Sequence, residues 1–405
     1  MWQMNAVSFR ASRAVRPLAV GALALALGVA CAEAQTAPPD PNEVHESGGH
    51  RFRLVTVADG LEHPWSIAFL PGGDMLVTER TGKLRAIRGG KLQPEPISGV
   101  PAVRVGGQGG LLDVVLHPDF ANNQLVYLSF SKPSADGATG TTAIVRGRLE
   151  GNALTGVQEI FEADAWSKGQ GHYGSRLAFD SDGFLFITIG DRQAPPSGDL
   201  ENHPAQLLTT HQGKVIRLHD DGRVPTDNPF VSRAGAKPEI WSYGHRSLQG
   251  LAIDPAGNIW ESEHGPQGGD ELNLIRRGAN YGWPVIGYGV NYGPARTPIH
   301  ASSARQGMEQ PVRYWVPSIG TSGLMFYTGD KFPNWKGNIF MGGMNGNQSL
   351  ARLTTDGTRV TEEAKMLGAA LRVRDVRQSP TGDIYLALDD RGDATTGIVR
   401  FEPVN

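Results

Sequence analysis

The chain has 405 residues, a formal net charge of −3, 53 glycines and 27 prolines. So many glycines and prolines are hard to place in a helical protein and fit a loop-rich, all-β fold. A general nucleic-acid-binding protein needs a basic face, which the slightly acidic balance argues against. The length alone allows one to three domains.

The first 34 residues have the pattern of a secretory signal peptide. Three arginines precede the apolar run LAVGALALALGVA, and the small-residue sequence AEA ends the segment at Ala34. The run is too short to cross a membrane, so we expect cleavage after Ala34 and a periplasmic or secreted protein without a membrane span. Lipoprotein cleavage at Cys31 is the less favoured alternative, because Gly28 stands where such sites usually have a larger aliphatic residue.

Residues 35–50, QTAPPDPNEVHESGGH, are polar and rich in proline and glycine, which predicts a disordered leader. We expect the remaining residues, 51–405, to form a single domain. Because the only cysteine lies in the signal peptide, the mature chain would have no disulfide and would depend on its core or on bound ions for stability.

One pattern recurs six times after the leader: a turn rich in Asp, Asn or Gly, followed by a strand of alternating apolar residues. The copies are LPGGDMLVTER, FANNQLVYLSF, DSDGFLFITIG, DPAGNIWESEH, NWKGNIFMGG and SPTGDIYLALD, anchored at Gly73, Asn123, Gly183, Gly257, Gly337 and Gly382. Such turns predict hairpins, and their recurrence is typical of propeller blades. We therefore predict a six-bladed β-propeller of four-stranded antiparallel blades, with a β-sandwich or two unrelated β domains as alternatives.

The two ends of the predicted domain can complete one blade together. HRFRLVTVADGL at residues 50–61 and GIVRFEP at residues 397–403 both have the pattern of strands. Pairing them would close the ring. Residues 204–216, PAQLLTTHQGKVI, are compatible with a helix but do not exclude a strand.

In such a ring the loops at one end of the central channel carry function. Polar residues stand just before or after the repeated strands, namely Gln108, His172, Arg176, Asp191, Arg192, His245, Arg246 and Gln249. His172 is a candidate base or a satisfied turn residue, and Asp191 can be part of a surface ion pair. Arg372 and Arg374 share one face of a strand, which indicates an anion site or a solvated edge strand.

The segment SEHGPQGGDELNLIRRGANYGWP, residues 262–284, is unusually acidic. Glu263, Asp270 and Glu271 crowd around a glycine-rich bend, and such carboxylates repel one another unless they are solvated, hydrogen-bonded or bridged by a cation. Calcium prefers oxygen ligands. The segment is therefore either a calcium loop or a solvated turn.

Taken in order along the chain, these segments resemble the soluble quinoprotein sugar dehydrogenases and the similar aldose sugar dehydrogenases. The motifs are HPWSIAFLP, GQGGLLDVVLHPDF, GHYGSRLAF, GKVIRL with GRVPTDNPF, GHRSLQGLA, the acidic segment above, YWVPSI and RVRDV. The resemblance covers residues 54–401. It implies a six-bladed propeller that uses pyrroloquinoline quinone (PQQ) with calcium.

The resemblance also implies roles for single residues. His172 looks like the general base, oriented by Asp191, and Arg246 looks like a catalytic residue that, with calcium, polarises the quinone as negative charge builds on its oxygens. Cofactor contacts are implied at Gln108, Arg246, Ser247, Ser318, Asn345, Arg372 and Arg374. Arginine forks suit a tricarboxylate, because each presents two parallel donors to a carboxylate.

Metal contacts are implied at four further residues. The carbonyls of Gly265 and Pro266 look like those that hold the cofactor's calcium, and Glu271 with the Tyr281 carbonyl looks like a calcium site of its own. Asp270 is expected to support the nearby active site. No role is evident for Glu263.

Three residues depart from the pattern of the family. Ser247 stands where asparagine is common, Thr321 where proline is usual, and Asn345 where a lysine reaches the quinone. Losing that cation should weaken cofactor binding and turnover, unless Arg246 or Lys336 replaces it.

The resemblance therefore predicts a periplasmic enzyme that oxidises the anomeric hydroxyl of aldoses to lactones and passes the electrons to an external acceptor. Two alternatives stay open. One is a calcium-dependent propeller lactonase or another hydrolase, which would not need the pair of Arg372 and Arg374. The other is a non-catalytic propeller that has lost its cofactor, which Asn345 favours slightly.

Overall fold

The computed structural model describes residues 39–367 and 371–404. The described residues all belong to one compact unit. The expected signal peptide, with Cys31, lies outside the described residues. None of the described helices is long and apolar enough to cross a membrane.

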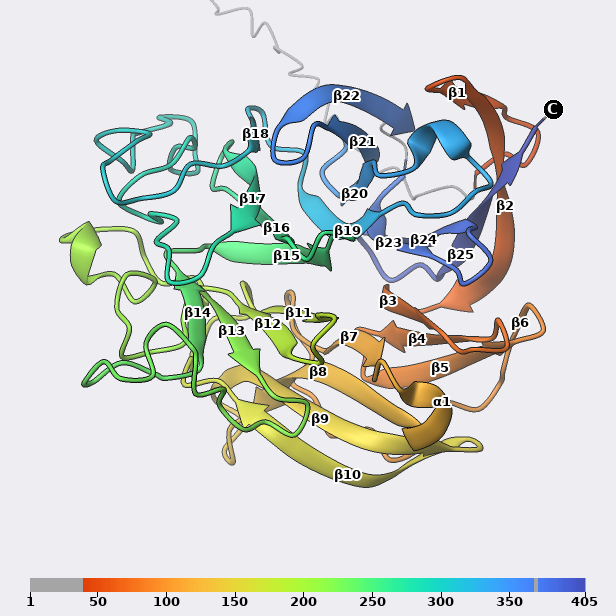
Figure 1. Ribbon diagram of the computed structural model, residues 1–405, viewed down its shortest axis with the longest axis horizontal. Coiled ribbons are helices and arrows are strands. Elements are labelled where there is room, and N and C mark those ends of the chain that lie inside the picture. The colour runs from red at the N-terminus through yellow and green to blue at the C-terminus, as the bar shows by residue number, and fades with distance from the viewer. Residues whose placement is uncertain (1–38, 368–370, 405) are drawn as a thin grey trace, which may run out of the picture. The chain divides into compact units, whose positions relative to one another are not determined.

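The described chain is all-β, with six antiparallel sheets, five of them built from consecutive strands (Figure 1). The first four blades are β3 (Pro64–Phe69), β4 (Met75–Glu79), β5 (Lys83–Arg88) and β6 (Lys91–Leu92); β7 (Leu111–Leu116), β8 (Leu125–Pro133), β9 (Gly140–Glu150) and β10 (Ala153–Glu162); β11 (Gly174–Phe179), β12 (Leu185–Ile189), β13 (Lys214–Leu218) and β14 (Ile240–Tyr243); and β15 (Ser247–Ile253), β16 (Ile259–His264), β17 (Asp270–Ile275) and β18 (Arg313–Trp315). The last two are β19 (Thr321–Phe326), β20 (Ile339–Gly343), β21 (Leu350–Thr355) and β22 (Val360–Leu367); and β23 (Val373–Gln378), β24 (Ile384–Leu388) and β25 (Thr396–Pro403) with β2 (His50–Leu61) and β1 (His45–Ser47). The short helices are α1 (Phe120–Asn123) and two 3-10 turns, η1 (Leu200–Asn202) and η2 (Pro333–Trp335). The six-bladed propeller is confirmed.

The sixth blade joins the two ends of the domain, as expected. β2 pairs antiparallel with β25 in the register Leu54↔Phe401. The same blade has a fifth short strand, because β1 pairs with the outer edge of β2. The backbone of Ser47 also accepts a hydrogen bond from Trp335 Nε1 at 3.2 Å. The prediction of a wholly disordered leader up to residue 50 is therefore wrong for residues 45–47, which fill the open edge of the sheet.

The repeated turns follow from backbone conformation. Gly73, Gly183, Gly257, Gly337 and Gly382 all have φ between +79° and +89°, a region in which an L side chain is strained. In the second copy a non-glycine residue takes the positive φ: the anchor Asn123 ends α1, and Gln124 after it has φ +56°.

The first strand of each blade lies nearest the centre of the ring (Figure 1). These six strands, β3, β7, β11, β15, β19 and β23, contact one another in sequence around the ring. Deep in the channel, Arg176 is 1% exposed and forms an ion pair with Asp375 at 3.0 Å. Its Nε also donates to the Gln249 carbonyl at 2.7 Å, so Arg176 links the inner strands of three blades.

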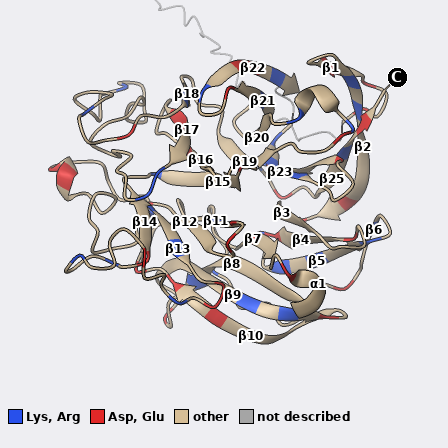
Figure 2. Ribbon diagram, in the orientation of Figure 1, with Lys and Arg blue, Asp and Glu red and all other residues tan. Residues whose placement is uncertain are grey.

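Figure 2 shows basic and acidic residues interspersed around the blades.

Candidate functional site

The candidate site lies where the inner strands begin. Gln108, His172, Arg246 and Arg372 all stand within three residues before an inner strand, so the ring brings together residues that are far apart in sequence. Two cavities meet there and share Gln108. The histidine cavity has a volume of about 380 Å³ and is lined by Gln108, His172, Asp191, Gln193, Ala194, Pro196, Arg246, Pro266, Trp283, Asn291, Tyr292 and Ile299. The cationic cavity has a volume of about 340 Å³ and is lined by Arg80, Gln108, Gln249, His264, Met344, Arg372, Arg374, Asp389, Asp390 and Arg391.

His172 is held in place from several sides. Its Nδ1 lies 2.6 Å from Asp191 Oδ1, and its backbone N–H donates to Gln108 Oε1 at 2.7 Å. The residue has φ +49°, a conformation that non-glycine residues keep where the surroundings enforce it, often at functional sites. Gly190 permits the close approach, because a Cβ there would lie 2.2 Å from the His172 carbonyl oxygen.

Asp191 fixes the tautomer of this histidine. Its Oδ2 accepts a hydrogen bond from Trp283 Nε1 at 2.8 Å, so both carboxylate oxygens are used. Burial alone would raise the pKa of Asp191, but His172 and Arg246 lower it further than burial raises it. An ionised Asp191 accepts the Nδ1 proton, which leaves Nε2 of His172 with a free lone pair.

The charge state of His172 suits a base. Burial lowers the pKa of His172 below its usual value, and the opposite effect of Asp191 does not compensate fully. The imidazole is therefore neutral at pH 7 and can accept a proton.

Arg246 stands beside the histidine. Its Nη1 donates to the carbonyls of His264 at 3.0 Å and Gly265 at 2.7 Å, and its guanidinium lies 5.2 Å from the Trp283 ring centroid. Its Nε is buried without a hydrogen-bond partner. A fixed cation with an unused donor can hold a negatively charged or polar ligand atom.

The cationic cavity brings four arginines together, Arg80, Arg372, Arg374 and Arg391. Burial lowers the pKa of Arg372 to about 10, and its Nε has no hydrogen-bond partner. Arg374 pairs with Asp389 at 3.3 Å, and burial alone would raise the pKa of that carboxyl, but His63 and Arg374 lower it to about 2. The arginines outnumber the carboxylates that line the cavity, so it is suited to an anion.

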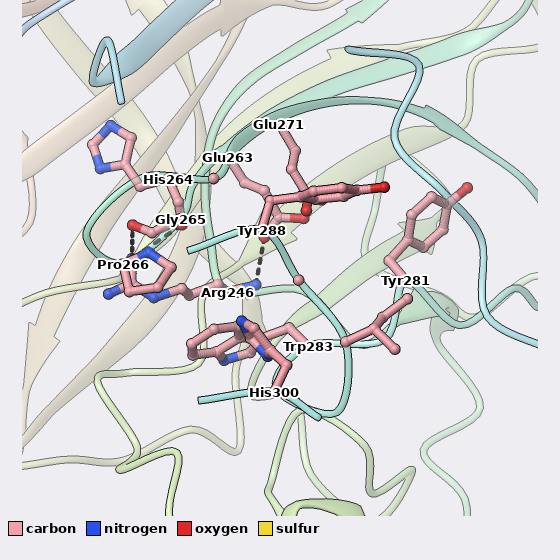
Figure 3. A pocket seen from close by; sticks show the side chains of 13 residues that line it. Arg246, Glu263, His264, Gly265, Pro266, Glu271, Tyr281, Trp283, Tyr288 and His300 are labelled. Atoms are coloured by element: carbon pink, nitrogen blue, oxygen red, sulfur yellow. Dashed lines mark hydrogen bonds between the residues drawn. The ribbon is translucent and has the colours of Figure 1, made fainter. Parts of the chain in front are cut away.

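The four expected metal-contacting residues line one further cavity. This carboxylate cavity has about 20 Å³ of space, enough for one water or ion, and its lining includes Gly265, Pro266, Glu271 and Tyr281, together with Glu263. Figure 3 shows the carboxylates of Glu263 and Glu271 pointing into the same space beside Tyr288. Burial and the Glu263 carboxylate raise the pKa of Glu271 well above its usual value.

These carboxylates share one face of blade 4. Glu263 pairs with Glu271 across β16 and β17, and Glu261 pairs with Asn273 in the same way. Residues two apart point to the same side of a strand, so all four side chains lie together. Glu263 also accepts from the Arg246 backbone N–H at 2.5 Å and contacts His245 Nδ1 at 3.1 Å. Glu263 thus has structural contacts that the sequence did not indicate.

Asp270 organises the neighbouring loops. One of its oxygens accepts from the Gly265 backbone N–H at 3.0 Å, and the other accepts from the backbone N–H groups of Ile319, Gly320 and Thr321 at 3.1, 2.6 and 3.3 Å. The carboxylate therefore connects the acidic segment to the turn before β19.

Three residues that were expected to contact the cofactor, Ser247, Ser318 and Asn345, line none of the three cavities. Ser247 is buried and accepts from Gln249 Nε2 at 3.3 Å, while Asn345 donates to the Ser318 carbonyl. The suggested substitute Lys336 also lines none of the three cavities; it is exposed and pairs with Asp330 at 2.8 Å. Arg246 does stand at the site.

Some lining residues were not found from the sequence. Arg80 follows the repeated strand of blade 1 directly, as Asp191 nearly does in blade 3, so its position could have indicated it. Tyr292 lines the histidine cavity and is 71% exposed. It lies in a long loop without a repeated pattern, which gave no signal.

Comparison with known proteins finds relatives that span nearly the whole domain. A profile of the family described as "Glucose / Sorbosone dehydrogenase" matches residues 61–399. The aldose sugar dehydrogenase YliI of Escherichia coli is 43% identical over 342 residues, which is 83% of this chain and 90% of the relative. The apo crystal structure of the soluble aldose sugar dehydrogenase from Escherichia coli superposes with a TM-score of 0.80 at 39% identity, covering 87% of this chain and all of that one. The PQQ-bound form of the aldose sugar dehydrogenase from Streptomyces coelicolor superposes with a TM-score of 0.70 at 29% identity, covering 91% and 100%.

Proposed function

Because the chain belongs to the glucose/sorbosone dehydrogenase family, we propose that it oxidises aldoses at the anomeric carbon to lactones, with PQQ as hydride acceptor and calcium as the metal. The family makes it an oxidoreductase that acts on sugars. The observation that best supports this proposal is that two cavities share Gln108. One contains a neutral, oriented His172, and the other has an excess of arginines.

The residues of the site fit a flat tricarboxylate. Arg246 Nε and Arg372 Nε are buried donors without partners, and each residue lines one of the two cavities. Buried polar groups normally have hydrogen-bond partners, so these atoms suit a polar ligand. Arg372 and Arg374 would hold carboxylates of PQQ, and Arg246 and Gln108 would contact it from the side of the histidine.

In the proposed reaction, His172 Nε2 takes the proton of the anomeric hydroxyl while Asp191 stabilises the imidazolium that forms. PQQ, when bound, supplies the quinone that accepts the C1 hydride. Arg246 provides positive charge where negative charge develops. Trp283 and Tyr292 offer aromatic surface in the lining of the histidine cavity, where a sugar would bind.

The metal proposal rests on the carboxylate cavity. Glu271 and the Tyr281 carbonyl are oxygen donors of the kind that calcium prefers, and they line the same small cavity as Gly265 and Pro266. As the resemblance implies, the Gly265 and Pro266 carbonyls would hold the cofactor's calcium, while Glu271 and the Tyr281 carbonyl would hold a calcium ion of their own. The Gly265 carbonyl also accepts from Arg246 Nη1.

We further propose a periplasmic or secreted location with an external electron acceptor. Its support is the sequence pattern of the first 34 residues. Amino-terminal sequencing of the exported protein should begin at residue 35.

The proposed function is tested by reconstitution. Purified protein is incubated with PQQ and calcium, and reduction of a dye is followed on addition of an aldose. We expect dye reduction that requires all three components. Lactone hydrolysis without PQQ would support the hydrolase instead, and no PQQ binding would support the non-catalytic propeller.

A further inference from the structure

The acidic face of blade 4 contains a third carboxylate that the proposed function does not use. Glu261 is 0% exposed, and its Oε1 has no hydrogen-bond partner. Leaving a buried carboxylate oxygen unpaired is costly. Its place beside Glu263 and Glu271 therefore requires an explanation.

The three carboxylates surround a single point. Asn273 Nδ2 lies 3.3 Å from Glu261 Oε2, 3.1 Å from Glu263 Oε1 and 3.4 Å from Glu271 Oε2. One ligand atom each of His245, Glu261 and Glu263 also lies within 4.8 Å of the others. One amide group with two hydrogens thus serves three anionic groups, and two of its three contacts are longer than typical N–H···O bonds.

The amide itself has an unused acceptor. Asn273 Oδ1 is buried without a partner. A half-turn of the amide exchanges its oxygen and nitrogen without changing the shape of the side chain. After that rotation, Asn273 Oδ1 and the three carboxylates would face the same point. A hard cation prefers such a set of oxygen ligands.

From this geometry we infer that Glu261, Glu263 and Glu271, with Asn273 Oδ1, bind one buried divalent cation of the calcium class. The inference rests on the calcium proposed at Glu271 and adds Glu261 and Glu263 as its ligands. Charge supports a single ion: the three carboxylates are balanced by one divalent cation and the guanidinium of Arg246, which lines the carboxylate cavity together with Glu263 and Glu271. The ion would fasten β16 and β17 to the loop of Tyr281.

The test uses the full mature protein without PQQ. Trp283 and Tyr281 line the cavity, so terbium bound there should show luminescence sensitised by these rings, and calcium should displace it. We expect Glu261→Gln and Glu271→Gln each to weaken calcium binding at least about ten-fold. Glu239→Gln is the control, because Glu239 pairs with His211 away from the cavity.

Thermal melting provides a second readout that a misfolded variant cannot imitate. In chelator, Glu261→Gln should melt at or above the wild-type temperature, since one repelling carboxylate is gone, yet it should gain less from added calcium. A gain equal to that of the wild type would overturn the role of Glu261. If only Glu271→Gln lost the calcium-dependent rise in melting temperature, the calcium site proposed at Glu271 would stand and this inference would fail. A wild type that binds neither terbium nor calcium would contradict both the Glu271 site and this inference, and it would say nothing about PQQ binding.

Discussion

Nδ1 of His172 lies 2.6 Å from Oδ1 of Asp191 because the two residues flank the hairpin of β11 and β12. Gly174 pairs with Ile189 at the end of this ladder, so the residues just outside it face each other. The same carboxylate is also fixed by the Trp283 indole N–H. This arrangement positions the imidazole before any substrate arrives, and the first predictions follow from it.

Replacing the histidine should remove the base and leave the cofactor site. We expect His172→Gln to lower turnover by about two to four orders of magnitude, the usual contribution of a positioned general base. PQQ affinity, measured by titration of the quinone absorbance, should stay near the wild-type value. His219→Gln is the control, because His219 packs on Phe184 and lines none of the cavities. Unchanged turnover in His172→Gln would remove the assignment.

The pH dependence of activity should reflect the interaction between His172 and Asp191. Since burial lowers the pKa of His172, the imidazole stays neutral down to pH values below about 6.5, and activity should fall only below that point. Asp191 raises the pKa of His172, so Asp191→Asn should move the acid limb to still lower pH while reducing the rate. A limb that shifts to higher pH in Asp191→Asn would contradict the coupling.

The arginines of the cationic cavity should control cofactor affinity. Loss of one charged hydrogen-bonding partner costs about 1.5–3 kcal/mol, so Arg372→Gln and Arg374→Gln should each weaken PQQ binding about ten- to a hundred-fold. Arg313→Gln serves as the matched control, because Arg313 pairs with Glu363 on the outside of blade 4. Equal affinity in all three variants would show that the cavity does not hold the cofactor.

Asn345 offers a gain-of-function test. Its neighbour Met344 lines the cationic cavity, and the Met344 carbonyl accepts from Arg372 Nη1. Asn345→Lys should therefore bring a cation near the cofactor and raise PQQ affinity or turnover. Asn345→Gln adds length without charge and should do neither. If Asn345→Lys also has no effect, another group, such as Arg246, already supplies that charge.

The fold was predictable because its signal is repeated and local. Each turn anchored by a residue such as Gly73 or Gly382 needs a positive φ, and each is followed by strand alternation. The closure of the ring by β2 and β25 followed from the same pattern at the two ends. β1 was missed because its order comes from the edge of β2 and from Trp335, contacts that a polar segment of three residues does not encode.

The site was predictable where it stands next to the repeated strands. His172, Asp191 and Arg372 all flank strands of the blades, so closing the ring brings them to the same end of the central channel. Glu261 was missed because a glutamate in an alternating strand usually points to solvent, whereas the folded chain buries this one. Ser247 and Asn345 stand beside the cavities rather than in them, a difference in side-chain direction that spacing cannot show.

The central claim is that His172 and the cationic cavity together support oxidation of an aldose at C1 by bound PQQ. An anaerobic single turnover tests it most directly: protein loaded with PQQ and calcium is mixed with an aldose carrying deuterium at C1, and the quinone spectrum and the released product are followed. The account predicts one lactone per PQQ and slower reduction with the deuterated sugar than with the ordinary one. Reduction without lactone, or no reduction by any aldose while PQQ is bound, would contradict it.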